Sequence, residues 1–245
     1  SGNVHELAEA VQAAGLWSAL GIAHTRWATH GGPSESNAHP HVSGDDIAVV
    51  HNGIIENHEP LRRELEAAGY GFDSDTDTEV IAHLIHQARS DGAGLAEAVR
   101  RVASRLEGAY ALGVLAADEP DHLVALRSGS PLVIGLGFEE NFIASDQLAL
   151  LPVTNRFIFL DEGDLAEVTR DRIHIIDREG RAAEREVHEF DGSYEDAEKG
   201  EYRHFMRKEI FEQPLALQRT LEGRLDGDVA LIHEVGDHGA AIFDQ

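Results

Sequence analysis

The hydrophobic pattern of the chain changes at residues 109–117, which read AYALGVLAA. Upstream of this stretch, apolar residues recur at helical spacing, and we expect helices over residues 3–20, 57–69, 77–90 and 95–106. From Ala109 onward, short apolar or alternating runs are separated by turn sequences such as DEG at residues 161–163, a pattern typical of strands. Helices followed by strands favour an α+β fold, in which antiparallel sheet packs against helices, over a parallel doubly wound fold.

The expected strands share short length and strong flanking turn signals, and they cover residues 109–117, 122–128, 132–136, 142–145, 156–160, 164–169, 173–176 and 183–190. One earlier strand, Ile47–Val50, lies in a segment rich in His, Gly, Asn and Thr. After the strands, a helix from Tyr202 is expected to break at Pro214 and to resume to about Leu221. The polar residues 222–245 have the composition of a linker.

The chain has 245 residues, with 45 acidic and 20 basic side chains and a formal net charge of -25. Such a surface repels phosphate backbones and anionic membranes, so we expect neither nucleic acid nor a membrane as a partner. No apolar run approaches the ~18–20 residues of a membrane-spanning helix and no secretory signal is evident, so we expect a cytoplasmic protein. The cysteine count is zero, which excludes disulfides and a cysteine nucleophile in the chain as given.

Arg26 is the first candidate for a binding residue. It lies in a loop of His, Thr and Gly residues, beside Trp27. Its planar guanidinium could hold a carboxylate through two parallel hydrogen bonds. Alternatively, it is a surface arginine that stacks on Trp27 or pairs with one of the many acids. The local sequence leaves both interpretations open.

Asn52 and Gly53 follow the expected strand. Asn-Gly is the strongest short signal for a hairpin turn, and that is the simpler interpretation. In the functional interpretation, the Asn52 amide and the Gly53 N–H together form an oxyanion hole. Gly53 would suit that role because the missing side chain lets a ligand approach the backbone.

Asp77 lies at an expected helix start. It could be an N-cap, with Glu79 adding to the favourable interaction with the helix dipole. It could instead bind an ammonium group, since a helix N-terminus favours the ionised carboxylate. Six histidines fall between His24 and His58, but they lack metal-site spacing and a cysteine partner, so we expect no metal and no other cofactor.

Four of these segments in this order form a recognisable set: GIAHTRWATHG (21–31), NAHPH (37–41), HNGIIEN (51–57) and TDTE (76–79). Together they resemble the glutaminase domains of the glucosamine-6-phosphate synthases, a family of class II glutamine amidotransferases. The resemblance continues through RSGSPL (127–132), SDQLA (145–149) and EQP (212–214), and so covers nearly the whole chain.

The resemblance implies an N-terminal-nucleophile hydrolase fold, an αββα sandwich, with a glutaminase domain over residues 1–221 and a linker over 222–245 toward an absent sugar isomerase domain. It implies L-glutamine as the substrate, with its α-carboxylate on Arg26 helped by Thr29 and His30. Its α-ammonium is expected on Asp77, with Asn52 and Gly53 as the oxyanion hole and His39 in a supporting role. Fructose 6-phosphate would be used only through the absent domain, in a homodimeric full-length enzyme.

The sequence departs from the family at its start. The family nucleophile is an N-terminal cysteine whose α-amino group is the base, and the expected opening Cys-Gly-Ile-Val-Gly is absent. We therefore expect a fold incomplete at its N-terminus and a chain inactive alone. Ser1 is a poor substitute because it opens a helix rather than a strand. Two alternatives remain, namely a non-catalytic glutamine-binding regulatory module and the glutaminase domain of another class II amidotransferase.

Overall fold

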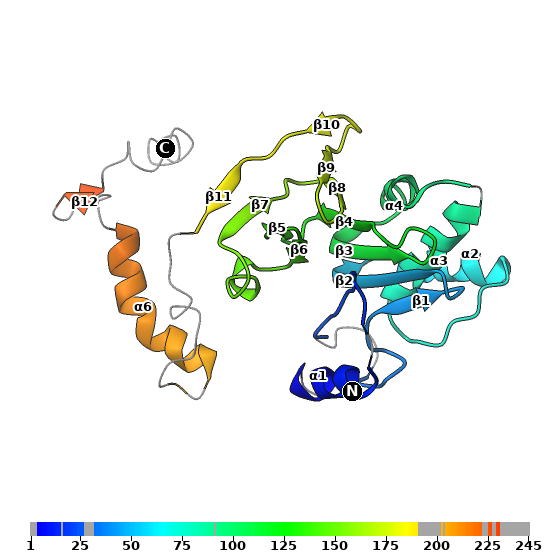
Figure 1. Cartoon of the computed structure of the whole chain (residues 1–245), viewed down its shortest axis with the longest axis horizontal. Coiled ribbons are helices and arrows are strands. Elements are labelled where there is room, and N and C mark those ends of the chain that lie inside the picture. The colour runs from blue at the N-terminus through cyan, green and yellow to red at the C-terminus, as the bar shows by residue number, and fades with distance from the viewer. Residues whose placement is uncertain are drawn as a thin grey trace. The chain divides into compact units, whose positions relative to one another are not determined.

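The structure is a computed structural model that describes residues 4–15, 17–26, 32–90, 92–190, 202, 204–221, 225–226 and 229–230. The chain divides into two compact units, residues 1–191 and 192–245 (Figure 1). The first unit contains every expected site residue that the structure describes.

A seven-stranded antiparallel sheet forms the centre of the first unit. Its strands in spatial order are β1 (His41–Ser43), β2 (Ile47–Ile55), β3 (Gly108–Ala116), β4 (Leu123–Ser128), β8 (Leu165–Val168), β9 (Ile173–Ile176) and β10 (Ala182–Ala183). The longest pairing joins β2 to β3, from Ile47 opposite Ala116 to Ile55 opposite Gly108. Residues 109–117, where the hydrophobic pattern changes from helical to strand-like, lie almost entirely in β3. This strand therefore connects the helical half of the chain to the strand-rich half.

A second, four-stranded antiparallel sheet is built entirely from the later half of the unit. Its order is β11 (Val187–Glu189), β7 (Arg156–Phe159), β5 (Val133–Leu136) and β6 (Asn141–Ala144), followed in the chain after β6 by the short 3₁₀ helix η1 (Gln147–Ala149). The expected single strand over 183–190 is therefore wrong. Residues 182–183 pair with β9 in the larger sheet, whereas 187–189 pair with β7 in the smaller one, because the chain crosses between the sheets in between.

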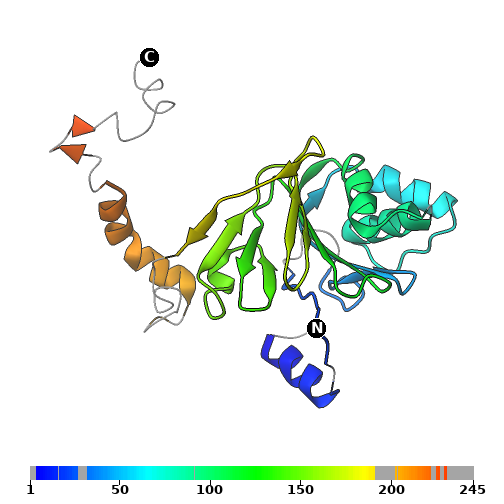
Figure 2. The ribbon, with the colours of Figure 1, turned by 45° about the horizontal axis from the view of Figure 1, so that its top comes forward.

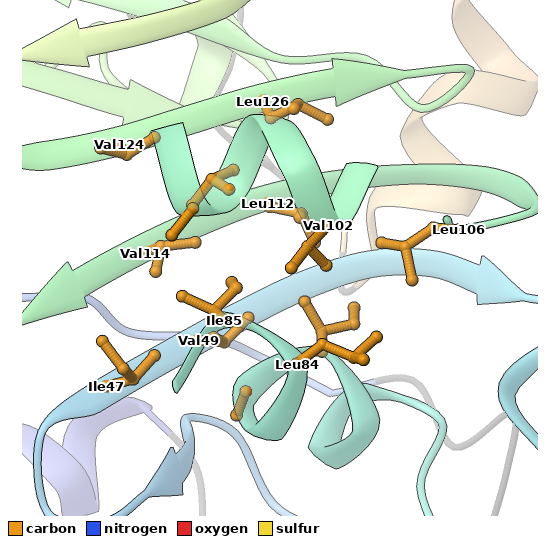
Figure 3. Close-up of a cluster of buried hydrophobic side chains, with 14 of the residues drawn as sticks. Ile47, Val49, Leu84, Ile85, Val102, Leu106, Leu112, Val114, Val124 and Leu126 are labelled. Carbon is orange, nitrogen blue, oxygen red and sulfur yellow. The ribbon is translucent and has the colours of Figure 1, made fainter. Parts of the chain in front are cut away.

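Helices α2 (His58–Ala67), α3 (Thr78–Ser90) and α4 (Leu95–Ala103) pack on one face of the larger sheet, as Figure 2 shows. Residues that alternate along β3 go to opposite sides. Leu112 and Val114 join the helix-side core with Leu84 and Ile85 (Figure 3), whereas Ala111 joins a cluster shared with the smaller sheet. This alternation is what a strand buried on both faces requires.

The first unit therefore has a helix layer, a large sheet and a smaller sheet, and the expected α+β class is confirmed. The first helix, α1 (Val4–Ala13), is shorter than the expected 3–20, since Gly15 adopts a positive φ of 64° that cannot continue a helix. None of the helices in the described part of the chain is long and apolar enough to cross a membrane.

The second unit contains α6 (Phe205–Leu221) and a short hairpin of β12 (Leu225–Asp226) and β13 (Val229–Ala230). The expected break at Pro214 is wrong, because α6 runs through it. A proline removes one N–H from the helix ladder, and the hydrogen bonds of the neighbouring turns can remain. The expected domain boundary at residue 221 stays a prediction.

Candidate functional site

A pocket of about 280 Å³ lies where three segments of the first unit converge. It is lined by residues of the segment 24–26, of the β2 end and of the α3 start, with His39 beside them. Five of the predicted site residues line it together: Arg26, His39, Asn52, Gly53 and Asp77. The other two, Thr29 and His30, lie outside the described residues. Residues separated by up to 51 positions in sequence are thus neighbours around one small cavity.

Asn52 and Gly53 lie inside β2 and do not form a hairpin turn, so the simpler interpretation of this pair is wrong. Gly53 sits opposite Tyr110 with a φ of 128°, a value that side chains rarely allow. A Cβ at this position would overlap the carbonyl oxygen of Ala109 and lie 2.7 Å from the Tyr110 Cα. Glycine is required here because the neighbouring strand occupies the side-chain space.

Asp77 connects the helix layer to the sheet. Its Oδ2 accepts a hydrogen bond of 2.8 Å from the N–H of Ile55, the last residue of β2. Both residues are buried. The carboxylate therefore stands just before α3 and fixes the end of the strand that carries Asn52 and Gly53.

Arg26 is linked to the Asp77 loop through two backbone groups and one side chain. Its Nη1 donates to the carbonyl of Gly32 at 3.2 Å, and the same carbonyl accepts from Asn37 Nδ2 at 3.0 Å. The Oδ1 of Asn37 accepts from the N–H of Asp75 at 2.9 Å. Asn37 is buried and joins the segment that holds the cation to the segment that holds the anion, a role that local sequence did not suggest.

Four histidines pack between these segments. The rings of His24 and His39 stack at 4.2 Å, and His41 and His51 lie at 5.0 Å and 6.4 Å from His39. Burial, followed by the repulsion of the other three histidines and Arg26, lowers the pKa of His39 to about 2. His39 is therefore neutral near pH 7. Its Nδ1 accepts the N–H of His51 at 3.2 Å, which leaves the proton on Nε2, facing Thr78 Oγ1 at 3.4 Å.

Glu79 anchors the loop that precedes Asp77. Its carboxylate accepts the N–H groups of Asp73 and Ser74 at 2.9 Å and 2.8 Å and the Ser74 hydroxyl at 2.6 Å. Burial alone would raise its pKa, but the nearby His83 ring, at 3.7 Å, and the hydrogen bonds from Ser74 and Asp73 outweigh burial and lower the pKa to about 2. The expected dipole role of Glu79 is thus only part of its function, because it also holds the loop.

A second cavity, of about 580 Å³, adjoins the first and shares His24, Thr25, His51 and Asn52 with it. Its walls come from residues 19–25, from β2 and β3 of the larger sheet, and from the β6 region of the smaller sheet. Within the described part of the chain, β6 pairs only with β5, and residues 140–145 line this cavity. None of the His, Asp and Glu groups that the structure describes is arranged to hold a metal ion.

Residues 24–152, slightly more than half of the chain, match the family described as "Glutamine amidotransferase domain". The chain belongs to this family. The matched range begins at His24 and includes every predicted site residue, and the resemblance inferred from the sequence is confirmed.

Almost the whole chain matches longer relatives. The chain is 59% identical to the glutamine–fructose-6-phosphate aminotransferase (isomerizing) of Idiomarina loihiensis and 57% identical to that of Pseudomonas putida. Both matches cover 99% of this chain and 40% of the relative. The chain therefore spans about two fifths of the length of these relatives.

Among solved structures, the chain is similar to the glutamine phosphoribosylpyrophosphate amidotransferase of B. subtilis. The sequence identity is 26% and the TM-score is 0.54, over 63% of this chain and 34% of that one. A second solved structure, described as that of the allosteric regulatory enzyme of purine biosynthesis, matches with 27% identity and the same TM-score. These likenesses support the N-terminal-nucleophile amidotransferase fold that the sequence predicted.

We predict that Gly53→Ala destabilises the protein more than Gly69→Ala, as measured by urea unfolding. Both glycines have a positive φ, so both substitutions carry a backbone strain of about 1–3 kcal/mol. Only at Gly53 does the added Cβ also collide with a neighbouring strand, whereas nothing lies within 4 Å at Gly69. Equal losses in the two variants would show that β3 does not enforce the glycine.

We predict that the stabilisation due to Glu79 depends on pH. Its folded pKa of about 2 lies below the ordinary 4.5, so the stabilisation is complete above about 4.5 and disappears as the pH falls toward 2. The difference in unfolding free energy between wild type and Glu79→Gln should shrink over this interval in acid titrations. Glu97→Gln is the control, because the pKa of Glu97 is also about 2 but its side chain is 39% exposed. A larger effect for Glu97→Gln than for Glu79→Gln would contradict the prediction.

Proposed function

We propose that this chain is the glutamine-hydrolysing module of an enzyme that transfers the amide nitrogen of L-glutamine to fructose 6-phosphate and forms glucosamine 6-phosphate. The observation that carries the proposal is the convergence of Arg26, Asp77, Asn52 and Gly53 on one pocket of about 280 Å³. This volume lies near the lower end of the range of ligand sites, about 300–1,000 Å³, as befits a free amino acid.

The head group of glutamine is a zwitterion, and the pocket offers one charge of each sign for it. Arg26 would take the α-carboxylate, and Asp77 would take the α-ammonium. Both charges act on the same neighbour, His41: burial is the main cause that lowers its pKa, and among the smaller causes Arg26 lowers and Asp77 raises it. In a chain with a net charge of -25, an arginine at the pocket is a specific feature and does not reflect a basic surface.

The side-chain amide of glutamine would lie toward Asn52 and Gly53. Attack of a thiolate on the amide carbon forms a tetrahedral intermediate whose oxygen carries a negative charge. Two preorganised donors at this oxygen stabilise it, and the loss of one such donor typically costs about 2.7–4 kcal/mol. The α-amino base passes the proton of the thiol to the amide nitrogen, so collapse of the intermediate releases ammonia and leaves a thioester, which water hydrolyses to glutamate and the free thiol. The neutral His39 would add no competing charge to the site.

The nucleophile of this proposal lies on a segment beyond the 245 residues, because the chain contains no cysteine. The cavity of about 580 Å³ supports an entry route, since it shares Asn52 with the glutamine pocket and is lined by β6, whose second edge is unpaired among the described residues. An extended segment that begins Cys-Gly-Ile-Val-Gly could pair with that edge and bring its thiol to the pocket. Transfer to fructose 6-phosphate would need the part of the relatives that this chain does not match, and a homodimer stays a prediction.

We predict that Arg26→Ala lowers the affinity for L-glutamate, the product, by about tenfold or more in isothermal titration calorimetry. The loss follows from the removal of a charge-assisted hydrogen bond, worth about 1.5–3 kcal/mol. The affinity of Arg26→Lys should lie between those of wild type and Arg26→Ala, because lysine keeps the charge but lacks the planar guanidinium. The control is Arg172→Ala, an exposed arginine that does not line the pocket. Equal affinities in wild type and Arg26→Ala would place the site elsewhere.

We predict that the chain alone releases ammonia from L-glutamine only at background and that a cysteine segment restores activity. The chain is coexpressed with the opening segment of the Idiomarina loihiensis relative, up to the residue where its match with this chain begins. The control is the same segment with alanine in place of its first cysteine, which should stay at background. Ammonia release by the chain alone, abolished by Ser1→Ala, would overturn the assignment of the nucleophile. If ammonia is released neither with the cysteine segment nor with its alanine variant, a non-catalytic glutamine-binding module is favoured.

A further inference from the structure

His24 makes the closest contact to the side chain of Asn52. Its Nε2 lies 2.7 Å from the Asn52 Oδ1. An amide oxygen can only accept a hydrogen bond, so the Nε2 of His24 must carry the proton and donate it. His24 lines both cavities and therefore stands at the boundary between them.

The position of the proton on the His24 ring determines whether Asn52 turns its Oδ1 or its Nδ2 toward the pocket. If the proton were on Nδ1, the unprotonated Nε2 would accept from an Asn52 N–H, and the carboxamide would be turned by 180°. Its oxygen would then point toward the pocket, where it would repel a developing oxyanion. The Nε2–H tautomer instead directs the Nδ2 hydrogens away from His24 and leaves them available to a ligand.

Two further features of His24 matter: the surroundings of Nδ1 select this tautomer, and a stacking contact holds the ring. The Nδ1 of His24 is buried and has no hydrogen-bond partner among the residues that the structure describes. A proton on Nδ1 would therefore be a buried donor without an acceptor, which is costly. On one face, the ring stacks at 4.2 Å and 15° on His39, whose own bonds to His51 and Thr78 fix its orientation.

We propose that His24 is a positioning residue whose Nε2–H orients the carboxamide of Asn52, so that the Nδ2 group and not the oxygen faces the far end of the bound amino acid. This inference rests on the proposed function of the pocket. His24 need not touch the reacting atoms. It acts through Asn52, and its effect should be confined to ligands that carry a polar group at the far end of the side chain.

The test compares two ligands that share the same head group. L-glutamate carries a γ-carboxylate, and L-norvaline ends in a methyl group at that position. His24→Phe keeps a flat ring for the stack on His39 and removes the donor, whereas His24→Gln keeps an N–H donor near the position of Nε2. His174→Phe is the matched control, because His174 is exposed on β9 and lies outside both cavities.

By calorimetry, His24→Phe should lower the affinity for L-glutamate about tenfold or more and change that for L-norvaline less than about twofold. His24→Gln should restore most of the L-glutamate affinity, and His174→Phe should match wild type. An equal loss for both ligands in His24→Phe, or no loss for either, would overturn the proposal.

A second measurement does not depend on ligand binding or on the folding of a variant. Long-range ¹⁵N spectra of the wild-type chain should show His24 with a protonated Nε2 and an unprotonated Nδ1 near neutral pH. The opposite tautomer would overturn the proposal even if both ligands bind. If neither ligand binds the wild type, the proposed function of the pocket fails, and the spectrum still decides how His24 holds Asn52.

Discussion

The hydrogen bond from Ile55 N–H to Asp77 Oδ2 is the contact on which the site depends. It joins the end of β2 to the start of α3, and both residues are buried, so its loss would leave a polar group unsatisfied in the core. Asn52 and Gly53 come just before Ile55 on the same strand. One bond therefore holds the strand that carries Asn52 and Gly53 next to the segment that carries Asp77.

The position of Arg26 is fixed by hydrogen bonds through uncharged groups. Arg26 and Asn37 share the carbonyl of Gly32, and Asn37 reaches Asp75 beside the anionic end. Histidine rings also line this pocket, and His39 is kept neutral by burial and by its neighbours. The pocket thus has one cation, Arg26, and one anion, Asp77, among its lining residues.

The larger sheet explains why the smaller pocket and the larger cavity meet at Asn52. Alternate residues of β2 face opposite sides, so Val49 packs in the helix-side core while Val50 and Asn52 line the cavity between the sheets. His51 bonds Thr78 at the start of α3, and its neighbour Asn52 bonds His24. A strand buried on both faces can support a binding site on one side and a core on the other. The function proposed for this site also rests on the likeness of the chain to longer enzymes.

The α+β class and helices α2, α3 and α4 could be predicted from the sequence, because hydrophobic periodicity is a property of neighbouring residues. The order of four motifs also indicated the family and the residue types of the site. Local sequence could not decide between a turn and a strand at Asn52-Gly53, since the deciding contact is the carbonyl of Ala109 on another strand. For the same reason it missed that Asn57 bonds Arg105 and Glu107, and that Asp77 bonds Ile55. Local preference sets which conformations a segment can adopt, and only packing against distant segments selects one of them.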